Sequence, residues 1–318
     1  MVQYELNDLL TVLKNPELVG LLDRFAEACT ASRQRGDLQL SRFNSYDLVR
    51  QTFVIKAISP TYHVLIWRDT GEQVVLACQG LVASVYFPPV TAQTRVNPRA
   101  AHRSTQSVTI VGPGSTSFTS SLSAIKQIYR YFEQNFGMGE MRALQTDHVG
   151  DVAAIVGSTR YVTPTSYKIW PDVGIPDSID PDGILKRIVG EGKYAFTEDN
   201  VVSYRVVDER SLEVSDAQPS VFHQGHVVDI GVSFRAMKGR KQYSFIIQLE
   251  SILLGEREGA KLLAELVSDA NRHPASMVVE PVLLRKRHIE HTKEDLAETQ
   301  KRLHTLTLSD SQMSEIVE

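Results

Sequence analysis

The sequence has few cysteines, no excess of positive charge and no long apolar run. Cys29 and Cys78 are its two cysteines. They are too few for a disulfide framework or a thiolate metal site, and they favour a reducing compartment. The formal net charge of −4 excludes a globally basic nucleic-acid binder, so any polyanion contact has to be a local patch. Apolar runs stay short of the ~20 residues that span a membrane. We therefore expect a cytoplasmic or nuclear protein without membrane contact.

Catalytic signatures are missing as well. A predicted strand at 107–111 runs into a glycine loop and a helix, an order that suits phosphate binding at the helix N-terminus. The loop, from Gly112 to Ser117, has no lysine after Gly114 and does not complete a GxGxxG pattern. Ser115 also serves as an ordinary helix cap. We assign no catalytic residue, cofactor or metal ligand, and keep a phosphate-handling enzyme at this loop as an alternative.

Length and composition allow one large or two medium cores, because 42% of the 318 residues are hydrophobic and 23% are charged. Apolar spacing predicts helices at 3–34 and an antiparallel meander at 49–87. We expect an α+β protein in which N-terminal helices and an antiparallel sheet precede a β-rich module, a barrel or a curved sheet, with C-terminal helices. The predicted ranges are 1–170 for the helices, meander and covering helix, 171–183 for a linker, 184–306 for the β-rich module and 307–318 for a tail. The sequence leaves open whether the two halves share one core.

The clearest strand pattern lies in residues 222–254. Apolar residues alternate with small or polar ones from 227 to 236 and again from 243, the period of a half-buried strand. Gly239, between the two runs, stands where a tight hairpin needs a positive φ. We predict a two-stranded ribbon. Three basic residues occupy its tip: Lys238, Arg240 and Lys241.

A basic ribbon is compatible with single-stranded nucleic acid, because cations follow the phosphates and aromatic rings stack on bases. A second basic cluster lies in the aperiodic loop near 88–103. The predicted contacts are Arg95, Arg99, Arg103, Arg235, Lys238, Arg240, Lys241 and Tyr243. The same charges also keep a turn soluble and protect a strand edge from pairing. Our leading hypothesis is a non-enzymatic protein that binds an anionic ligand, most concretely single-stranded nucleic acid, through this hairpin and loop.

A long charged helix predicted at 283–306 supports the alternative of a protein-interaction or oligomerisation module. Ile289, Leu296 and Leu303 lie seven residues apart, as in a coiled-coil stripe. The other core position is polar, since Thr292 and Thr299 occupy it. The pattern fits either a surface helix docked on its own domain or self-association through this stripe and the sheet edges.

The ribbon also carries a resemblance. Phe222 and Gly225, followed by alternating valines up to Phe234 and by a second strand from Tyr243 into residues 249–254, resemble a segment of an uncharacterised protein family of mushroom-forming fungi. The resemblance implies a fungal, intracellular and expanded family. It implies no activity, cofactor or site residue.

Overall fold

The computed structural model describes residues 5–31, 36–94, 96–137, 139–207 and 214–272. The helices are α1 (Leu6–Leu13), α2 (Pro16–Ala31), α3 (Tyr46–Thr52), α4 (Thr116–Phe136), α5 (Ile184–Gly190) and α6 (Glu258–Arg272), with short 3-10 helices that include η3 (Pro98–Arg103) and η5 (Glu198–Asn200). The first strands are β1 (Phe53–Ser59), β2 (Tyr62–Trp67), β3 (Leu76–Tyr86), β4 (Thr105–Val111), β5 (Asp147–Val149) and β6 (Val152–Arg160). The later strands are β7 (Thr163–Pro164), β8 (Tyr194–Ala195), β9 (Ser203–Val207), β10 (Val214–Asp216), β11 (Val227–Lys238) and β12 (Tyr243–Glu256).

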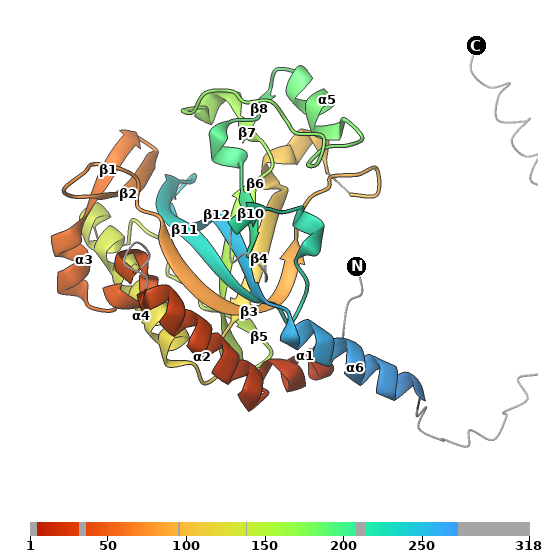
Figure 1. The fold of residues 1–318 in the computed structure, drawn as a ribbon. Helices are drawn as coiled ribbons and strands as arrows, with labels where there is room; N and C mark the ends of the chain where they lie inside the picture. The colour runs from red at the N-terminus through yellow and green to blue at the C-terminus, as the bar shows by residue number, and fades with distance from the viewer. Residues whose placement is uncertain (1–4, 32–35, 95, 138, 208–213, 273–318) are drawn as a thin grey trace, which may run out of the picture. The chain divides into compact units, whose positions relative to one another are not determined.

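A ten-stranded mixed sheet organises the described residues (Figure 1). Its order is β10-β9-β12-β11-β3-β4-β6-β5, and the β1–β2 hairpin joins it through β11. Strands β7 and β8 form a separate two-stranded sheet. The predicted α+β class is confirmed. Within the described residues no ladder joins β10 to β5, so the sheet is not closed into a barrel and the curved-sheet form is the one observed.

One face of the sheet is covered by α1, α2 and α6. Register aligns one residue from each of four neighbouring strands into an apolar row: Val227, Leu81, Val111 and Ala154. These residues share a cluster with Leu13 of α1, Leu22 of α2 and Leu263 of α6. The predicted N-terminal helices are confirmed, and Pro16 opens α2, where its fixed φ suits the first helical turn.

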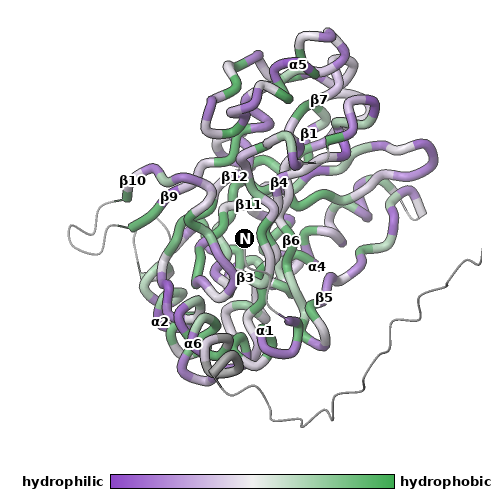
Figure 2. Tube along the Cα trace, turned by 90° about the vertical axis from the view of Figure 1, so that its right-hand side faces the viewer, coloured by the Kyte–Doolittle hydropathy of each residue, from purple (hydrophilic) through white to green (hydrophobic). Residues whose placement is uncertain are grey.

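The opposite face of the sheet is covered by α4. Successive strand residues point to opposite sides of a sheet, so the neighbours of the first apolar row face this helix. Val228, Ile110 and Ile155 each lie one residue from the first row, and they belong to a second cluster with Phe118 and Phe132 of α4. Figure 2 shows that residues along β3, β11 and β12 in the interior are mostly hydrophobic and that hydrophilic residues gather at the periphery.

Strand β11 differs from its predicted form in one respect. Residues Val227 to Ala236 are buried on both faces, so the prediction of a half-buried strand is wrong. The alternating polar residues Asp229, Ser233 and Arg235 are enclosed because neighbouring elements satisfy them; for example, Gln79 of β3 donates to Asp229 over 2.8 Å. Buried polar groups in a strand therefore produce the same alternation as a solvent-facing side.

The predicted meander at 49–87 is also corrected. β1 pairs with β2, but β2 and β3 then pair with β11, along the same edge of that strand: β3 aligns with residues 227–232 and β2 with residues 235–237, while β12 pairs along the other edge. The last part of this range is one long strand, β3. Strands of both predicted halves therefore share one sheet, and the main core draws on residues from Leu40 to Leu254.

A smaller cluster organises the α5 lobe, which we define as residues 161–200 together with the loop at 88–103. Val90, Ile179, Leu185 and Phe196 are among its buried members. The segment 171–183, predicted as a linker, contributes Ile179 to this cluster and also caps α5. There the Asp180 carboxylate accepts hydrogen bonds from the backbone N–H groups of Ile184 (2.7 Å) and Lys186 (2.9 Å). The segment is therefore packed along part of its length.

Candidate functional site

The tip of the predicted ribbon is present, with β11 and β12 paired antiparallel up to Lys238 and Tyr243. The turn covers residues 239–242, and the Gly239 N–H donates to the Gln242 carbonyl over 2.9 Å. Gly239 does not have a positive φ, which corrects the prediction, because the loop is longer than the two-residue turn that demands this conformation. Lys238, Arg240 and Lys241 are exposed.

Two other predicted contacts lie in the interior. The Arg235 side chain is 3% exposed, and Tyr243 is 8% exposed. Tyr243 stacks on Phe136 with ring centroids 4.1 Å apart and donates its hydroxyl to the Pro60 carbonyl. Phe136 therefore covers one face of the Tyr243 ring. The Lys238 ammonium lies 5.3 Å from the centroid of the same ring.

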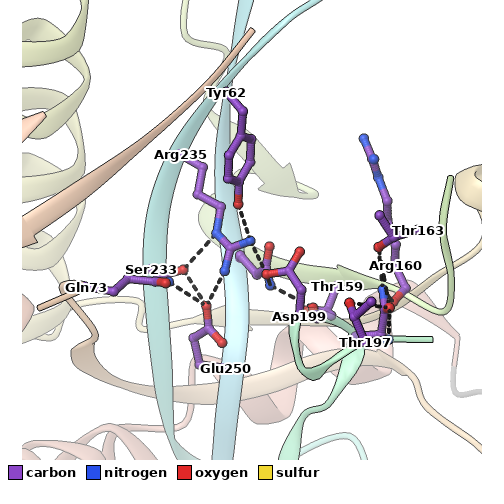
Figure 3. A network of polar contacts seen from close by, with 12 residues as sticks. Tyr62, Gln73, Thr159, Arg160, Thr163, Thr197, Asp199, Ser233, Arg235 and Glu250 are labelled. Carbon is purple, nitrogen blue, oxygen red and sulfur yellow. Dashed lines mark hydrogen bonds and ion pairs between the residues drawn. The ribbon is translucent and has the colours of Figure 1, made fainter. Parts of the chain in front are cut away.

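Arg235 is enclosed by acceptors (Figure 3). Its guanidinium forms ion pairs with Asp199 and with Glu250, the latter at 2.9 Å, and donates to the Tyr62 hydroxyl. Burial lowers the pKa of this guanidinium, but Asp199, Tyr62 and Glu250 outweigh it and raise the pKa overall. Burial is also the main cause of a raised Tyr62 pKa, so the phenol stays neutral as a hydrogen-bond partner. The donors of Arg235 are thus used to hold β11, β12 and η5 together.

The predicted basic loop contains η3. Arg99 and Arg103 are exposed, while Ala101 between them is fully buried and anchors the turn. The Asn97 side chain accepts from the Arg99 N–H over 3.0 Å and caps η3. Arg95 lies outside the described residues. Within the α5 lobe the loop contacts residues 161–200 through His102, whose ring stacks on Tyr194 with centroids 6.1 Å apart.

A hollow of about 500 Å³ opens between the α5 lobe and the sheet. Its walls come from the β1–β2 turn, the end of β6, the segment 166–170 and the paired strands β11 and β12. Among the lining residues are Tyr62, Arg160, Tyr167, Lys168, Ile169, Trp170, Met237 and Ile246. Tyr167 is 48% and Ile169 is 42% exposed, so large apolar surfaces remain accessible at its rim.

A second hollow of about 490 Å³ adjoins the first. The two share four lining residues: Arg160, Tyr167, Met237 and Ile246. The second is also lined by His102, Lys193, Tyr194 and Lys238. We call the joined hollows the Arg160 groove. It brings Lys238, at the tip end of β11, close to His102 of the basic loop, so these two predicted elements border the same groove.

Arg160 stands at the junction of the two hollows. Its half-buried guanidinium donates to the Met237 Sδ over 3.5 Å, and among the ion pairs of the described residues none includes Arg160. Burial lowers its pKa, an effect that Asp199 and Tyr62 oppose. Figure 3 shows its guanidinium extending away from the polar network around Arg235. A charged group with only a thioether acceptor retains most of its hydrogen-bonding capacity for a ligand.

The glycine loop at 112–117 has a structural role. A Cβ on Gly112 would lie 2.5 Å from the Phe118 side chain, so glycine permits close packing there. Ser115 caps α4 by accepting from the Phe118 N–H and donates its hydroxyl to Asp23 over 2.6 Å. A carboxylate at this helix N-terminus takes the place that an anionic ligand would occupy. The enzyme alternative at this loop stays a prediction.

The predicted self-association stripe lies outside the described residues. This holds for Ile289, Leu296 and Leu303, as well as for the tail and most of the predicted C-terminal helical region. Within the described ranges, no group of histidine, cysteine or acidic side chains is arranged to hold a metal ion. In the same part of the chain, no helix has the length and hydrophobicity to cross a bilayer.

Sequence reasoning missed the residues that make the groove: Arg160, Tyr167, Lys168, Trp170 and Lys193. One local signal was present, since Tyr167, Lys168 and Trp170 interleave aromatic and basic side chains just before the predicted linker. Arg160 gave no signal, because it ends an ordinary strand. Its role depends on which elements fold around it.

Comparisons with known proteins give little. No protein-family model matches the chain, and no curated protein matches it. Among solved structures it is similar to a single-stranded DNA-binding protein from bacteriophage Enc34 in complex with ssDNA, with a TM-score of 0.36 and 7% identity, over 64% of this chain and 95% of that chain. A likeness of this extent carries no argument about what this chain binds. The fungal resemblance and the expected location also stay predictions.

Proposed function

We propose that this protein binds single-stranded nucleic acid in the Arg160 groove. The observation that carries the proposal is the Arg160 guanidinium, which is half-buried, charged and free of any carboxylate partner among the described residues. Burial of this charge costs free energy that Asp199 only partly offsets, and an anionic ligand would offset more of it. The groove is long enough to span two hollows, as a chain-like ligand requires.

The charges around the groove favour a polyanion. Lys193 and Lys238 are exposed at the second hollow. Lys168 at the first hollow pairs with Asp172 on an exposed surface, where a phosphate can compete for the ammonium. The chain as a whole carries a net charge of −4, so the attraction is confined to this surface. Arg99 and Arg103 of η3 and the ribbon tip extend the basic surface beyond the groove.

Aromatic surfaces favour bases over a simple anion. Tyr167 is nearly half exposed at the rim shared by both hollows, with Trp170 close by in the first. A base that stacks on an aromatic ring contributes about 1–3 kcal/mol, and the contact tolerates any sequence. Duplex nucleic acid hides its bases, so these surfaces favour single strands.

The direct test is fluorescence anisotropy with a labelled single-stranded 12-mer, in DNA and RNA versions, at 50 and 200 mM salt. With about three phosphate contacts the affinity falls roughly 20-fold over this range. A duplex of the same sequence is expected to compete poorly. Absence of binding at 50 mM salt would overturn the proposal.

A charge-matched pair of variants locates the site. Lys193→Glu with Lys238→Glu reverses two charges at the groove, and we expect at least a tenfold loss of affinity with a shallower salt dependence. Lys126→Glu with Arg50→Glu reverses two exposed charges on α4 and α3 and should leave affinity within about twofold. Equal losses in both variants would indicate general electrostatic attraction without a groove.

A further inference from the structure

The Arg160 groove consists of two hollows that meet at the Arg160 side chain. Resting on the proposed function, we infer that the groove binds a dinucleotide step, with one base in each hollow and the phosphate between them on Arg160. Two hollows of nearly equal volume, about 500 and 490 Å³, meet at this side chain. A ligand that fills both has to cross the guanidinium.

The first hollow offers a stacking surface and apolar walls. Tyr167 is 48% exposed, and Trp170 lies in the same wall. Ile246 and Met237, on the two strands of the ribbon, form the opposing side. A flat base can lie between an aromatic ring and aliphatic side chains with little demand on its hydrogen-bonding groups.

The second hollow has a different stacking surface, the half-buried His102 ring, which lies against the buried Tyr194 ring. The two rings are nearly parallel, with an interplanar angle of 23°, and the Tyr194 hydroxyl donates to the Arg99 carbonyl. Burial, together with the charges of Arg160 and Arg103, lowers the His102 pKa, so the imidazole is neutral at pH 7. A neutral ring stacks on a base without adding charge. Lys193 and Lys238 flank it and suit the following phosphate.

Arg160 suits the phosphate between the bases. Its contact with the Met237 Sδ at 3.5 Å is a weak hydrogen bond, which a phosphate oxygen readily replaces. The planar guanidinium can donate two parallel hydrogen bonds to a phosphate, a geometry that a lysine ammonium does not offer. A mononucleotide can fill either hollow, but only an internal phosphate is held at the junction.

A length series tests this footprint. Thymidine oligonucleotides of one to six residues compete with the labelled 12-mer at 50 mM salt. We expect affinity to rise about tenfold from one residue to two and by smaller steps thereafter. Arg160→Gln should greatly reduce the first step, and Arg160→Lys should restore only part of it.

A chemical probe keeps the test independent of protein stability. A thymidine dinucleotide with an uncharged methylphosphonate linkage should bind wild-type protein several-fold more weakly than the natural dinucleotide. If it binds as well as the natural dinucleotide, or if affinity rises smoothly with length, the footprint is wrong although the groove still binds single strands. If the 12-mer itself does not bind, the proposed function fails and the footprint fails with it.

Discussion

Asp199 of η5 and Arg235 of β11 form an ion pair across 36 residues of sequence, which ties the α5 lobe to the centre of the sheet. Gln248 of β12 reinforces the contact by donating to the Asp199 carbonyl over 3.0 Å. One wall of the Arg160 groove belongs to the lobe and the other to the sheet. The ion pair therefore fixes the two walls relative to each other.

Arg235→Met is expected to lower the free energy of unfolding by roughly 3 kcal/mol, because it leaves the half-buried carboxylates of Asp199 and Glu250 without a compensating charge. Urea denaturation measures the change. Lys261→Met removes an ion pair with Glu258 whose side chains are 66% and 48% exposed, and should change stability by less than about 0.5 kcal/mol. Similar small values for both variants would contradict a structural role for Arg235.

The ribbon tip is expected to contribute less to binding than the groove. Arg240→Glu with Lys241→Glu changes the charge by the same amount as the groove pair, but at exposed turn positions that do not line either hollow. We expect a loss of about threefold at 50 mM salt that disappears at 200 mM, since distant exposed charges are screened. Anisotropy titrations at the two salt concentrations measure this loss of affinity. A loss equal to that of Lys193→Glu with Lys238→Glu would indicate that the ligand binds at the tip.

Gly259→Ala tests the packing of α6 on the loop before β11. A Cβ on Gly259 would lie 2.2 Å from the Gly225 carbonyl oxygen and 2.8 Å from a Leu18 methyl group, so the helix has to shift. We expect a loss of about 1–3 kcal/mol in thermal or urea unfolding. Gly190→Ala is the matched control, a helical glycine with no atom within 4 Å of the added Cβ, and it should be neutral or slightly stabilising. Equal effects would mean that helix propensity, and not the close contact, governs both.

Because His226 is buried, we expect the protein to lose stability in mild acid. Burial, with smaller effects of His223 and Arg257, lowers its pKa from 6.5 to about 4. Below pH 6.5 the unfolded chain binds a proton that the folded protein rejects, so stability falls as pH drops from 6.5 towards 4, by about 2 kcal/mol at pH 5. Above pH 6.5 this histidine has no such effect.

His226→Asn should flatten that pH dependence. The amide oxygen can still accept the His223 N–H, which lies 3.1 Å from the Nδ1 of His226, and it does not titrate. The measurement compares urea unfolding at pH 7.5 and pH 5. His148→Asn, at an exposed position, should keep the wild-type difference between the two pH values. An unchanged difference in His226→Asn would show that another group causes the acid sensitivity.

Local patterns predicted most of the elements. The helices α1, α2 and α4 and the β11–β12 ribbon follow from apolar periodicity, and the start of α2 follows from Pro16, because these features depend on neighbours a few residues away. Which strands pair with one another was not predictable in the same way. The pairing of both β2 and β3 with one edge of β11 depends on contacts between residues far apart in sequence, so the meander was expected instead.

The candidate site shows the same limit. Lys238, Arg240 and Lys241 were predictable as exposed charges, because a turn between two apolar strands has to lie in water. Arg235 was not predictable as a buried ion pair, since its strand position looks the same in sequence whether it faces solvent or Asp199.

The sequence by itself determined the α+β class, the ribbon with its basic tip and the need for any polyanion contact to be local, because composition and short-range periodicity fix these properties. Only the tertiary structure decided that Arg160, Tyr167, Lys193 and Lys238 share one groove. These residues come from β6, the segment after β7, the turn before β8 and the end of β11. Long-range strand pairing and the ion pair between Asp199 and Arg235 bring them together, and neither leaves a periodic trace in the sequence.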